Sequence, residues 1–311
     1  MDGLQAVASP LVAIVGPTAA GKSALALALA RERSGEIVCC DSLQVYRGLD
    51  IGSAKATAEE RAAVPHHLLD VVEPDQVFSA AEYSRQARTA LAGIAERGRL
   101  AVVAGGTGLY LRALLHGLFE GPSRDDDLRE RLERIATRGG DLRLHRMLAA
   151  VDPQAAARIA PRDRVRVIRA LEVFRSTRRP ISEHHRAGGG ALRGHEVLVL
   201  GLDPSREALR AAVERRTDDM FARGLLAEVK GLLDRGYGPE LRPLRAIGYR
   251  QALAVLRGEM ADDEARRAIV AETMKYAKRQ MTWFRHQTRA TWFAASQPAL
   301  AAARAWLDAR A

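Results

Sequence analysis

Apolar and polar positions in the first third of the chain follow two alternating patterns. Short, largely apolar runs occur at residues 11–15, 36–40 and 99–104, and segments with helical spacing lie between them, at 23–33 and 79–97. Near-continuous apolar runs are typical of parallel strands covered on both faces, and helices of this length are typical crossover connections. We therefore predict a parallel sheet flanked by helices.

The pattern changes between residues 121 and 193. No strand-like run occurs there, and Arg-rich helical segments are separated by Gly and Pro, as at Gly139-Gly140, Pro153, Pro161 and Pro180. A strand pattern returns at 197–202 and 290–294, with helical spacing at 206–216, 223–235 and 262–285. The sequence thus predicts a core formed by residues 1–120 and 194–311, with an inserted helical domain at 121–193.

Charge favours a polyanionic partner. The chain has 48 Lys and Arg against 38 Asp and Glu, a net charge of +10. The stretch 123–186 holds 16 Arg against 10 acidic residues, so the helical insertion carries much of the excess. Nucleic acid is attracted by such a surface, although an Arg- and Ala-rich composition can equally reflect a biased genome.

Other features exclude several classes of protein. Cys39 and Cys40 are adjacent, so they cannot join distant segments, and two ligands do not fill a structural zinc site. There is no apolar run of about 18 residues, and the first residues lack the basic segment of a secretory signal. We expect a soluble cytoplasmic protein that does not contact a membrane, and nothing indicates an apolar seam for oligomerisation, so we expect a monomer.

The strongest local motif is the segment 16–23, GPTAAGKS, which matches the phosphate-loop pattern G-x-x-x-x-G-K-[ST]. An apolar run precedes it and a helical segment follows, so backbone amides should converge on an anion at the start of that helix. Lys22 would neutralise phosphate oxygens, and the Ser23 hydroxyl would ligate Mg²⁺. The loop alone does not distinguish ATP from another diphosphate.

Three further segments carry candidate chemistry. Asp41 follows the second strand run and should lie beside the phosphate loop, either as a catalytic carboxylate or as a turn cap. The segment 105–108, GGTG, follows the third run, where it forms either a turn or part of the site. The segment 245–250, RAIGYR, joins two Arg and an aromatic ring, which suits gripping phosphates while a base stacks, or simply begins a solvated helix.

These motifs occur together in a known order. GPTAAGKS, DSLQVYRGLDIGSAK, PHHLLD, GGTGLYLRALLHGL, RVRVIRALEVF, RTDDMFARGLLAEV, RAIGYRQAL and YAKRQMTWFR follow one another from Val12 to about Trp292. In this the chain resembles the bacterial tRNA dimethylallyltransferases, also called tRNA isopentenyltransferases. The resemblance implies transfer of a dimethylallyl group from dimethylallyl diphosphate to N6 of the adenosine just 3′ of the anticodon, with release of diphosphate in the presence of Mg²⁺.

The resemblance also implies a role for each matched residue. Asp41 would be the general base, Arg216 would neutralise the departing diphosphate, and Thr107 would support the reacting end. The diphosphate would be bound by Gly16, Pro17, Thr18, Ala19, Ala20, Gly21, Lys22 and Ser23, with Mg²⁺ on Ser23. The anticodon stem-loop of tRNA would contact Asp41, Ser42, Leu43, Gln44, Thr107, Arg129, Val165, Arg166, Val167, Ile168, Arg169, Arg245, Ala246, Ile247, Gly248, Tyr249 and Arg250.

Two other functions remain open from the residues themselves. One is a small-molecule kinase, in which Asp41 and Arg216 serve phosphoryl transfer from ATP. The other is a nucleotide-regulated RNA-binding protein without turnover. The fold class predicted in all three cases is an α/β, P-loop-containing parallel sheet flanked by helices, with an inserted helical domain.

Overall fold

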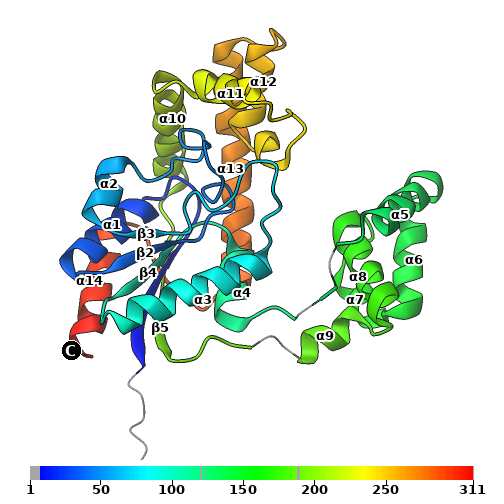
Figure 1. Cartoon of the computed structure of the whole chain (residues 1–311), viewed down its shortest axis with the longest axis horizontal. Helices are drawn as coiled ribbons and strands as arrows, with labels where there is room; N and C mark the ends of the chain where they lie inside the picture. Colours follow the sequence, from blue (N-terminus) through cyan, green and yellow to red (C-terminus); the bar gives the residue numbers. More distant parts are fainter. Residues whose placement is uncertain (1–7, 120, 123, 188–189, 311) are drawn as a thin grey trace, which may run out of the picture. The chain divides into compact units, whose positions relative to one another are not determined.

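The computed structural model describes residues 8–119, 121–122, 124–187 and 190–310. It divides the chain into two compact units (Figure 1). The core unit comprises the chain up to Leu114 and from Leu192 onward, and the helical unit comprises Leu115–Ala191. The helical unit begins earlier than residue 121, because the last residue that α4 buries in the core unit is Leu114.

The core unit is built on a six-stranded sheet with the order β3-β2-β4-β1-β5-β6. Every neighbouring pair is parallel, which confirms the sequence prediction. The strands are β1 (Ser9–Val15), β2 (Glu36–Cys39), β3 (His66–His67), β4 (Ala101–Ala104), β5 (His195–Leu202) and β6 (Thr291–Phe293). Only β3 was not predicted, because two residues leave no apolar pattern to detect.

Helices cover both faces of this sheet, as the buried strands require. On one face, α1 (Lys22–Glu32) and α14 (Ser296–Asp308) pack over Val12 and Ile14 in a common hydrophobic core. Leu11 and Ala13 point to the opposite face and are also fully buried. Helix α3 (Ala80–Glu96) packs against β2 and β4, and α4 (Gly108–His116) follows β4 directly. This double coverage explains why the strands read as continuous apolar runs.

The remaining core helices follow β5, apart from α2 (Ala58–Ala63), which precedes β3. They are α10 (Arg206–Ala222), α11 (Leu225–Asp234), the 3₁₀ turn η1 (Arg242–Arg245), α12 (Tyr249–Leu256) and α13 (Asp262–Gln287). Helix α13 packs against both α10 and α12 (Figure 1). Through these contacts α10 and α13 bring Arg216 and Gln280 to the functional site.

The helical unit has its own hydrophobic core. It contains α5 (Asp126–Gly139), α6 (Asp141–Val151), α7 (Pro153–Arg158), α8 (Arg164–Thr177) and α9 (Ile181–Ala187). Leu132, Leu144, Leu148 and Val167 meet in its interior. Asp125, Asp152 and Asp163 cap the first turns of α5, α7 and α8 with side-chain hydrogen bonds to backbone N–H groups. No helix in the described part of the protein is long and apolar enough to cross a bilayer.

Candidate functional site

A cavity of about 760 Å³ opens where the carboxyl ends of three adjacent strands meet. The phosphate loop (residues 16–23) follows β1, the segment 41–44 follows β2, and Gly105-Gly106 follow β4. Helices α10 and α13 complete the wall with Arg216, Tyr276 and Gln280. The predicted convergence of the phosphate loop and Asp41 at one edge of the sheet is therefore observed, as expected for a doubly wound α/β protein.

The phosphate loop needs glycine at two of its positions. Gly16 has φ +140°, and a Cβ there would lie 2.5 Å from the backbone oxygen of Leu202. Gly21 has φ +89° and immediately precedes α1, whose first residue is Lys22. These conformations strain an L side chain, so both glycines are required by the backbone path itself. The start of α1 lines the cavity, and the first amide groups of a helix have no partner within it, which suits an anion.

Lys22 is the cation of this loop. Its Nζ donates a hydrogen bond of 2.6 Å to the Pro17 carbonyl, so the side chain is folded along the loop. Burial lowers the pKa of Lys22 to about 8, while the nearby negative charge of Asp41 raises it. Lys22 is therefore charged below about pH 8, and its side chain lies ready to pair with an entering phosphate group.

Asp41 caps a turn, which is one of the two roles that the sequence left open. Its Oδ1 accepts hydrogen bonds from the backbone N–H of Leu43 at 2.8 Å and of Gln44 at 3.4 Å, which caps the turn. No hydrogen bond to Oδ2 occurs within the described residues, and Asp41 lines the cavity. The capping bonds fix the orientation of the carboxylate, and the second oxygen is available to a ligand.

Arg216 reaches the phosphate loop from α10. Its Nη1 donates to the Thr18 hydroxyl at 3.0 Å, and its Nη2 donates to the Ser53 carbonyl at 3.3 Å. Burial lowers the pKa of Arg216, and the negative charge of Asp41 raises it. A guanidinium held by two neutral oxygens keeps its full charge available, so Arg216 can neutralise an anion on the loop.

Thr107 supports the segment that carries Asp41. Its hydroxyl accepts a hydrogen bond of 3.0 Å from the Ser42 backbone N–H, and its own N–H donates to the Cys40 carbonyl at 3.1 Å. The loop after β4 is thereby tied to the segment after β2. Thr107 thus contacts the segment that carries Asp41 without lining the cavity itself, and the role in supporting the reacting end that the resemblance implies stays a prediction.

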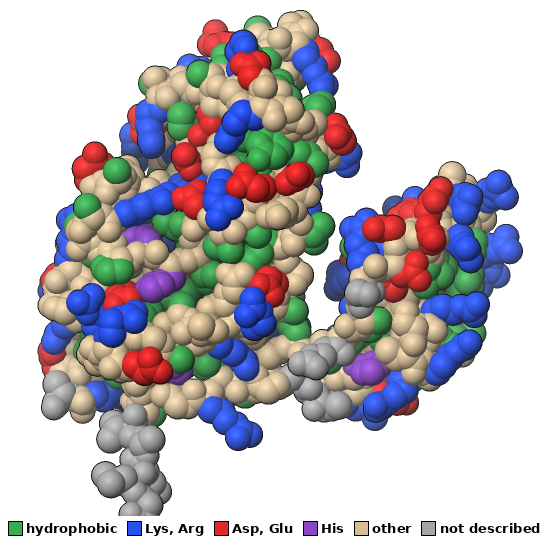
Figure 2. All heavy atoms as spheres, in the orientation of Figure 1, with side chains coloured by type: hydrophobic (Ala, Val, Ile, Leu, Met, Phe, Trp, Pro, Cys, Tyr) green, Lys and Arg blue, Asp and Glu red, His purple; other side chains and the backbone are tan. Residues whose placement is uncertain are grey.

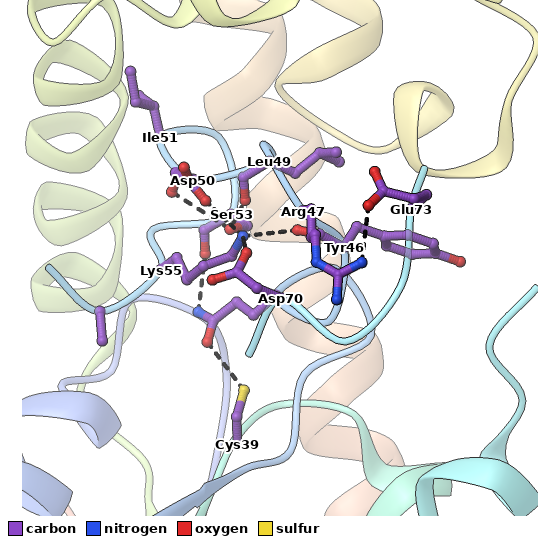
Figure 3. A network of polar contacts seen from close by, with 12 residues as sticks. Cys39, Tyr46, Arg47, Leu49, Asp50, Ile51, Ser53, Lys55, Asp70 and Glu73 are labelled. Carbon is purple, nitrogen blue, oxygen red and sulfur yellow. Dashed lines mark hydrogen bonds and ion pairs between the residues drawn. The ribbon is translucent and has the colours of Figure 1, made fainter. Parts of the chain in front are cut away.

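A buried lysine organises the loop beyond Gln44 (Figure 3). The Lys55 ammonium donates to the Tyr46 carbonyl at 2.7 Å and to the carboxylates of Asp50 and Asp70 at 2.5 and 2.7 Å. The sequence analysis assigned Lys55 no role, although it ends the motif DSLQVYRGLDIGSAK. Its partners lie 5 to 15 positions away, which explains why spacing alone did not reveal it.

The segment 245–250 differs in part from its prediction. Arg245 is exposed at the cavity rim with Ala246 and Ile247, as an RNA contact requires. Tyr249 is fully buried and its hydroxyl donates to Glu228 at 2.8 Å, so the predicted stacking of a base on this ring is wrong. The Tyr249 ring instead packs closely against Gly52, where a Cβ would lie only 2.5 Å from the ring. Arg250 forms an ion pair with Glu272.

The predicted RNA contacts of the helical unit also divide into two groups. Val165 and Arg166 are exposed, whereas Val167 and Ile168 are buried in the core of the unit, so a side-chain contact of these two with RNA is corrected to a packing role. Helical spacing explains the difference, because only one face of α8 can meet solvent. Figure 2 shows Arg side chains across the visible face of this unit, beside an acidic group.

Two arginines of the helical unit share one buried carboxylate. Arg129 donates to Glu172 at 2.7 and 2.9 Å, and Arg169 donates to the same carboxylate at 2.5 Å. Although burial raises the pKa of Glu172, these hydrogen bonds lower it to about 2. Glu172 therefore stays ionised and offsets part of the positive charge of Arg129 and Arg169. Both remain partly exposed, so their outer N–H groups can still meet a phosphate.

The donor set of the cavity suits a Mg²⁺ ion that arrives with a diphosphate. Ser23 is exposed in the cavity and offers a hydroxyl oxygen close to the phosphate loop, and Asp41 is a carboxylate on the same wall. Within the described ranges, no three His, Cys, Asp or Glu side chains come together as a metal cage. Mg²⁺ in phosphate sites is usually held by few protein oxygens together with substrate oxygens and water, which these residues match.

The fold and this cavity together define an α/β protein of the phosphate-loop class, in which a carboxylate and an arginine face the loop. Residues 44–287 match the family model described as IPP transferase. The chain therefore belongs to the IPP transferase family, which confirms the resemblance seen in its motifs and makes it a transferase.

Curated relatives and solved structures agree with this membership. A tRNA dimethylallyltransferase of Geobacter metallireducens is 51% identical over 282 residues, covering 91% of each chain. Another, of Anaeromyxobacter dehalogenans, is 52% identical over 284 residues, covering 91% of this chain and 94% of that protein. The crystal structure of the tRNA isopentenylpyrophosphate transferase of Bacillus halodurans has a TM-score of 0.66 at 42% identity, covering 92% of this chain and 89% of that one. A eukaryotic dimethylallyltransferase acting on tRNA has a TM-score of 0.73 at 28% identity, with 89% and 70% covered.

Proposed function

We propose that the protein transfers a dimethylallyl group from dimethylallyl diphosphate to the exocyclic N6 of the adenosine 3′ of the anticodon in tRNA. The observation that carries this proposal is a single cavity lined by both a phosphate loop with its cations and the carboxylate of Asp41. Such a cavity can hold an anionic leaving group at one end and accept a proton at the other. The sequence relatives named tRNA dimethylallyltransferase support the same reaction.

The residues divide the chemistry between them. N6 attacks the first carbon of the dimethylallyl group, and the new C–N bond forms as the C–O bond to diphosphate breaks. The N6 proton passes to Asp41, which is needed because an adenine amine is a weak nucleophile. The bonding electron pair leaves with diphosphate, whose charge is stabilised by Lys22 and Arg216. The reacting base must be extruded from the anticodon loop to enter a cavity of this kind.

Mg²⁺ fits this scheme as an ion bound with the donor. The Ser23 hydroxyl would hold it beside the diphosphate oxygens. When bound, the ion supplies additional neutralisation of charge on the leaving group. The acid–base step depends on Asp41, and the anchoring of the loop depends on Arg216 and Thr18.

The function is tested by incubating purified protein with labelled dimethylallyl diphosphate, Mg²⁺ and unmodified tRNA. We expect label in the tRNA, and none in a matched tRNA in which another base replaces the adenosine 3′ of the anticodon. A parallel reaction contains ATP without the prenyl donor. Consumption of ATP without transfer of label would favour the kinase, and binding of RNA without either reaction would favour the protein without turnover.

The pKa of Lys22 predicts how diphosphate binding depends on pH. A lysine whose pKa lies at about 8 is charged below that pH and loses its charge as pH rises through it. We expect the affinity for inorganic diphosphate to fall above this pH, approaching about tenfold per pH unit if only the charged form binds. Titration calorimetry between about pH 7 and about pH 9.5 measures the effect. The variant Lys22→Arg stays charged over this range, so the pH dependence of its affinity serves as the control for ionisation of the ligand. Equal slopes of log affinity against pH for wild type and Lys22→Arg would contradict the prediction.

Arg245 is expected to contact an RNA phosphate. It is exposed at the cavity rim and makes no ion pair within the described residues, unlike Arg250. We expect Arg245→Ala to weaken tRNA binding and to reduce the slope of log affinity against log salt by about one unit. Arg250→Ala should have a smaller effect, because Glu272 already offsets its charge. Arg31→Ala, at the far end of α1, is the matched control, and a slope unchanged from wild type in Arg245→Ala would exclude the contact.

A further inference from the structure

Gln280 joins two loops of the site. It lies on α13 and is only 7% exposed. Its Oε1 accepts a hydrogen bond of 2.9 Å from the Thr18 backbone N–H, and its Nε2 donates one of 2.9 Å to the Gly106 carbonyl. The fit is close, because a Cβ on Gly106 would lie 2.4 Å from that Nε2. One side chain thus ties the phosphate loop to the loop after β4.

The side chain of Thr18 makes a further hydrogen bond. The Thr18 hydroxyl accepts from Arg216, and Arg216 donates in turn to the Ser53 carbonyl. The same Ser53 carbonyl accepts a hydrogen bond of 3.1 Å from the Gln44 side chain. The chain of contacts therefore runs from α13 through the phosphate loop to the segment that follows β2.

The chain of contacts closes on itself. Gln44 lies two positions after Ser42, whose N–H donates to the Thr107 hydroxyl, and Thr107 directly follows Gly106. The result is a ring of hydrogen bonds, completed by short stretches of backbone, through residues that mostly line the cavity. Thr18 and Arg216 lie on the part of the ring that would bind the prenyl donor. Thr107 and the segment that begins with Asp41 lie on the part that would meet the accepting base.

We propose that Gln280 is a positioning residue, which sets the phosphate loop at the correct distance from the segment holding Asp41. This inference rests on the proposed function, since it concerns how the prenyl donor meets the base. In a bimolecular transfer, a misplacement of about 1 Å costs up to about 100-fold in rate. The strands that precede the two loops pair with each other, and Gly105 N–H donates to the Ile14 carbonyl at 3.2 Å. Beyond that pairing, Gln280 links Thr18 to Gly106 through one side chain, whereas the route round the ring passes through Arg216 and two further hydrogen bonds.

The amide group is specifically suited to this position. It presents an acceptor to one backbone group and a donor to the other at the same time. Leu fills a similar volume but satisfies neither partner. Glu satisfies the Thr18 N–H, yet when ionised it cannot donate to the Gly106 carbonyl, whereas protonated Glu can.

The experiment compares wild type, Gln280→Leu, Gln280→Glu and the control Gln287→Leu, an exposed residue near the end of the same helix. Steady-state rates are measured with dimethylallyl diphosphate and an anticodon stem-loop RNA, and folding is followed by thermal melting. We expect Gln280→Leu to lower kcat about tenfold, with both KM values within about threefold of wild type. Gln287→Leu should match wild type in every measurement.

The pH profile of Gln280→Glu separates positioning from mere packing. We expect its rate relative to wild type to rise as pH falls, because the protonated carboxyl restores the bond to Gly106. Both proteins contain Lys22, Asp41, Arg216 and Tyr276, so the ratio largely removes their titration. A rate ratio of Gln280→Glu to wild type that does not change with pH would overturn the proposal. So would a loss of rate in the variants that the unfolded fraction fully accounts for. The pH test with Gln280→Glu can be made even if Gln280→Leu does not fold. If wild type itself puts no label into RNA, the proposed function fails instead.

Discussion

Replacing Asp41 with asparagine is expected to lower kcat for prenyl transfer at least about 100-fold, with little change in tRNA affinity. Asparagine keeps an oxygen that can accept from the Leu43 and Gln44 N–H groups, so the turn is retained. It lacks the basic carboxylate oxygen that takes the proton from N6. The effect is therefore expected on the chemical step rather than on folding or RNA binding.

Single-turnover rates with labelled donor and an independent RNA-binding titration together measure this effect. Asp234→Asn, which alters an exposed carboxylate paired with Lys230 on α11, is the matched control. Turnover in Asp41→Asn within about threefold of wild type would remove Asp41 from the mechanism. A large loss of RNA affinity at unchanged kcat would assign it to binding instead.

Loss of Arg216 has the second large effect. Arg216→Ala is expected to lower kcat about 100- to 1,000-fold, which is typical for removal of one group that stabilises developing negative charge. The variant also frees the Thr18 hydroxyl and the Ser53 carbonyl, so the phosphate loop loses an anchor. Arg216→Lys restores charge but not the paired donors, and we expect it to recover only part of the rate.

The donor supplies a further test of this role. Arg216→Ala should slow transfer from a donor whose leaving group needs less charge stabilisation by a smaller factor than it slows transfer from dimethylallyl diphosphate. Arg210→Ala, on an exposed turn of the same helix beside Glu214, is the control for helix stability. An equal loss of rate in both Arg variants would show that α10 has been destabilised and would argue against a specific role of Arg216.

The fold was predictable where the pattern was long and regular. The runs at 11–15 and 36–40 became β1 and β2, and the helical spacing at 79–97 became α3, because burial on both faces leaves a strong apolar pattern. The strand β3 has only two residues and the helix α12 only eight, so each pattern is too short to identify from the sequence. Propensity over so few residues is too weak to identify them.

The site was predictable to the extent that it follows strands directly. Lys22 and Asp41 each come immediately after a strand or its loop, and parallel topology alone brings such positions together. Gln280 could not be found in this way, because it is 262 positions from its partner Thr18. The burial of Tyr249 was missed because the acceptor of its hydroxyl, Glu228, lies on another helix. These contacts arise from tertiary packing, which periodicity does not report.

The packing of α1 against α14 has a consequence for synthesis of the chain. Leu25 and Leu29, just after the phosphate loop, share a hydrophobic core with Leu300 and Ala303. A ribosome makes α14 long after α1, with the whole helical unit between them. The nascent chain therefore exposes an incomplete apolar surface until α14 has been made, and binding of that surface by a chaperone would be most valuable during this interval.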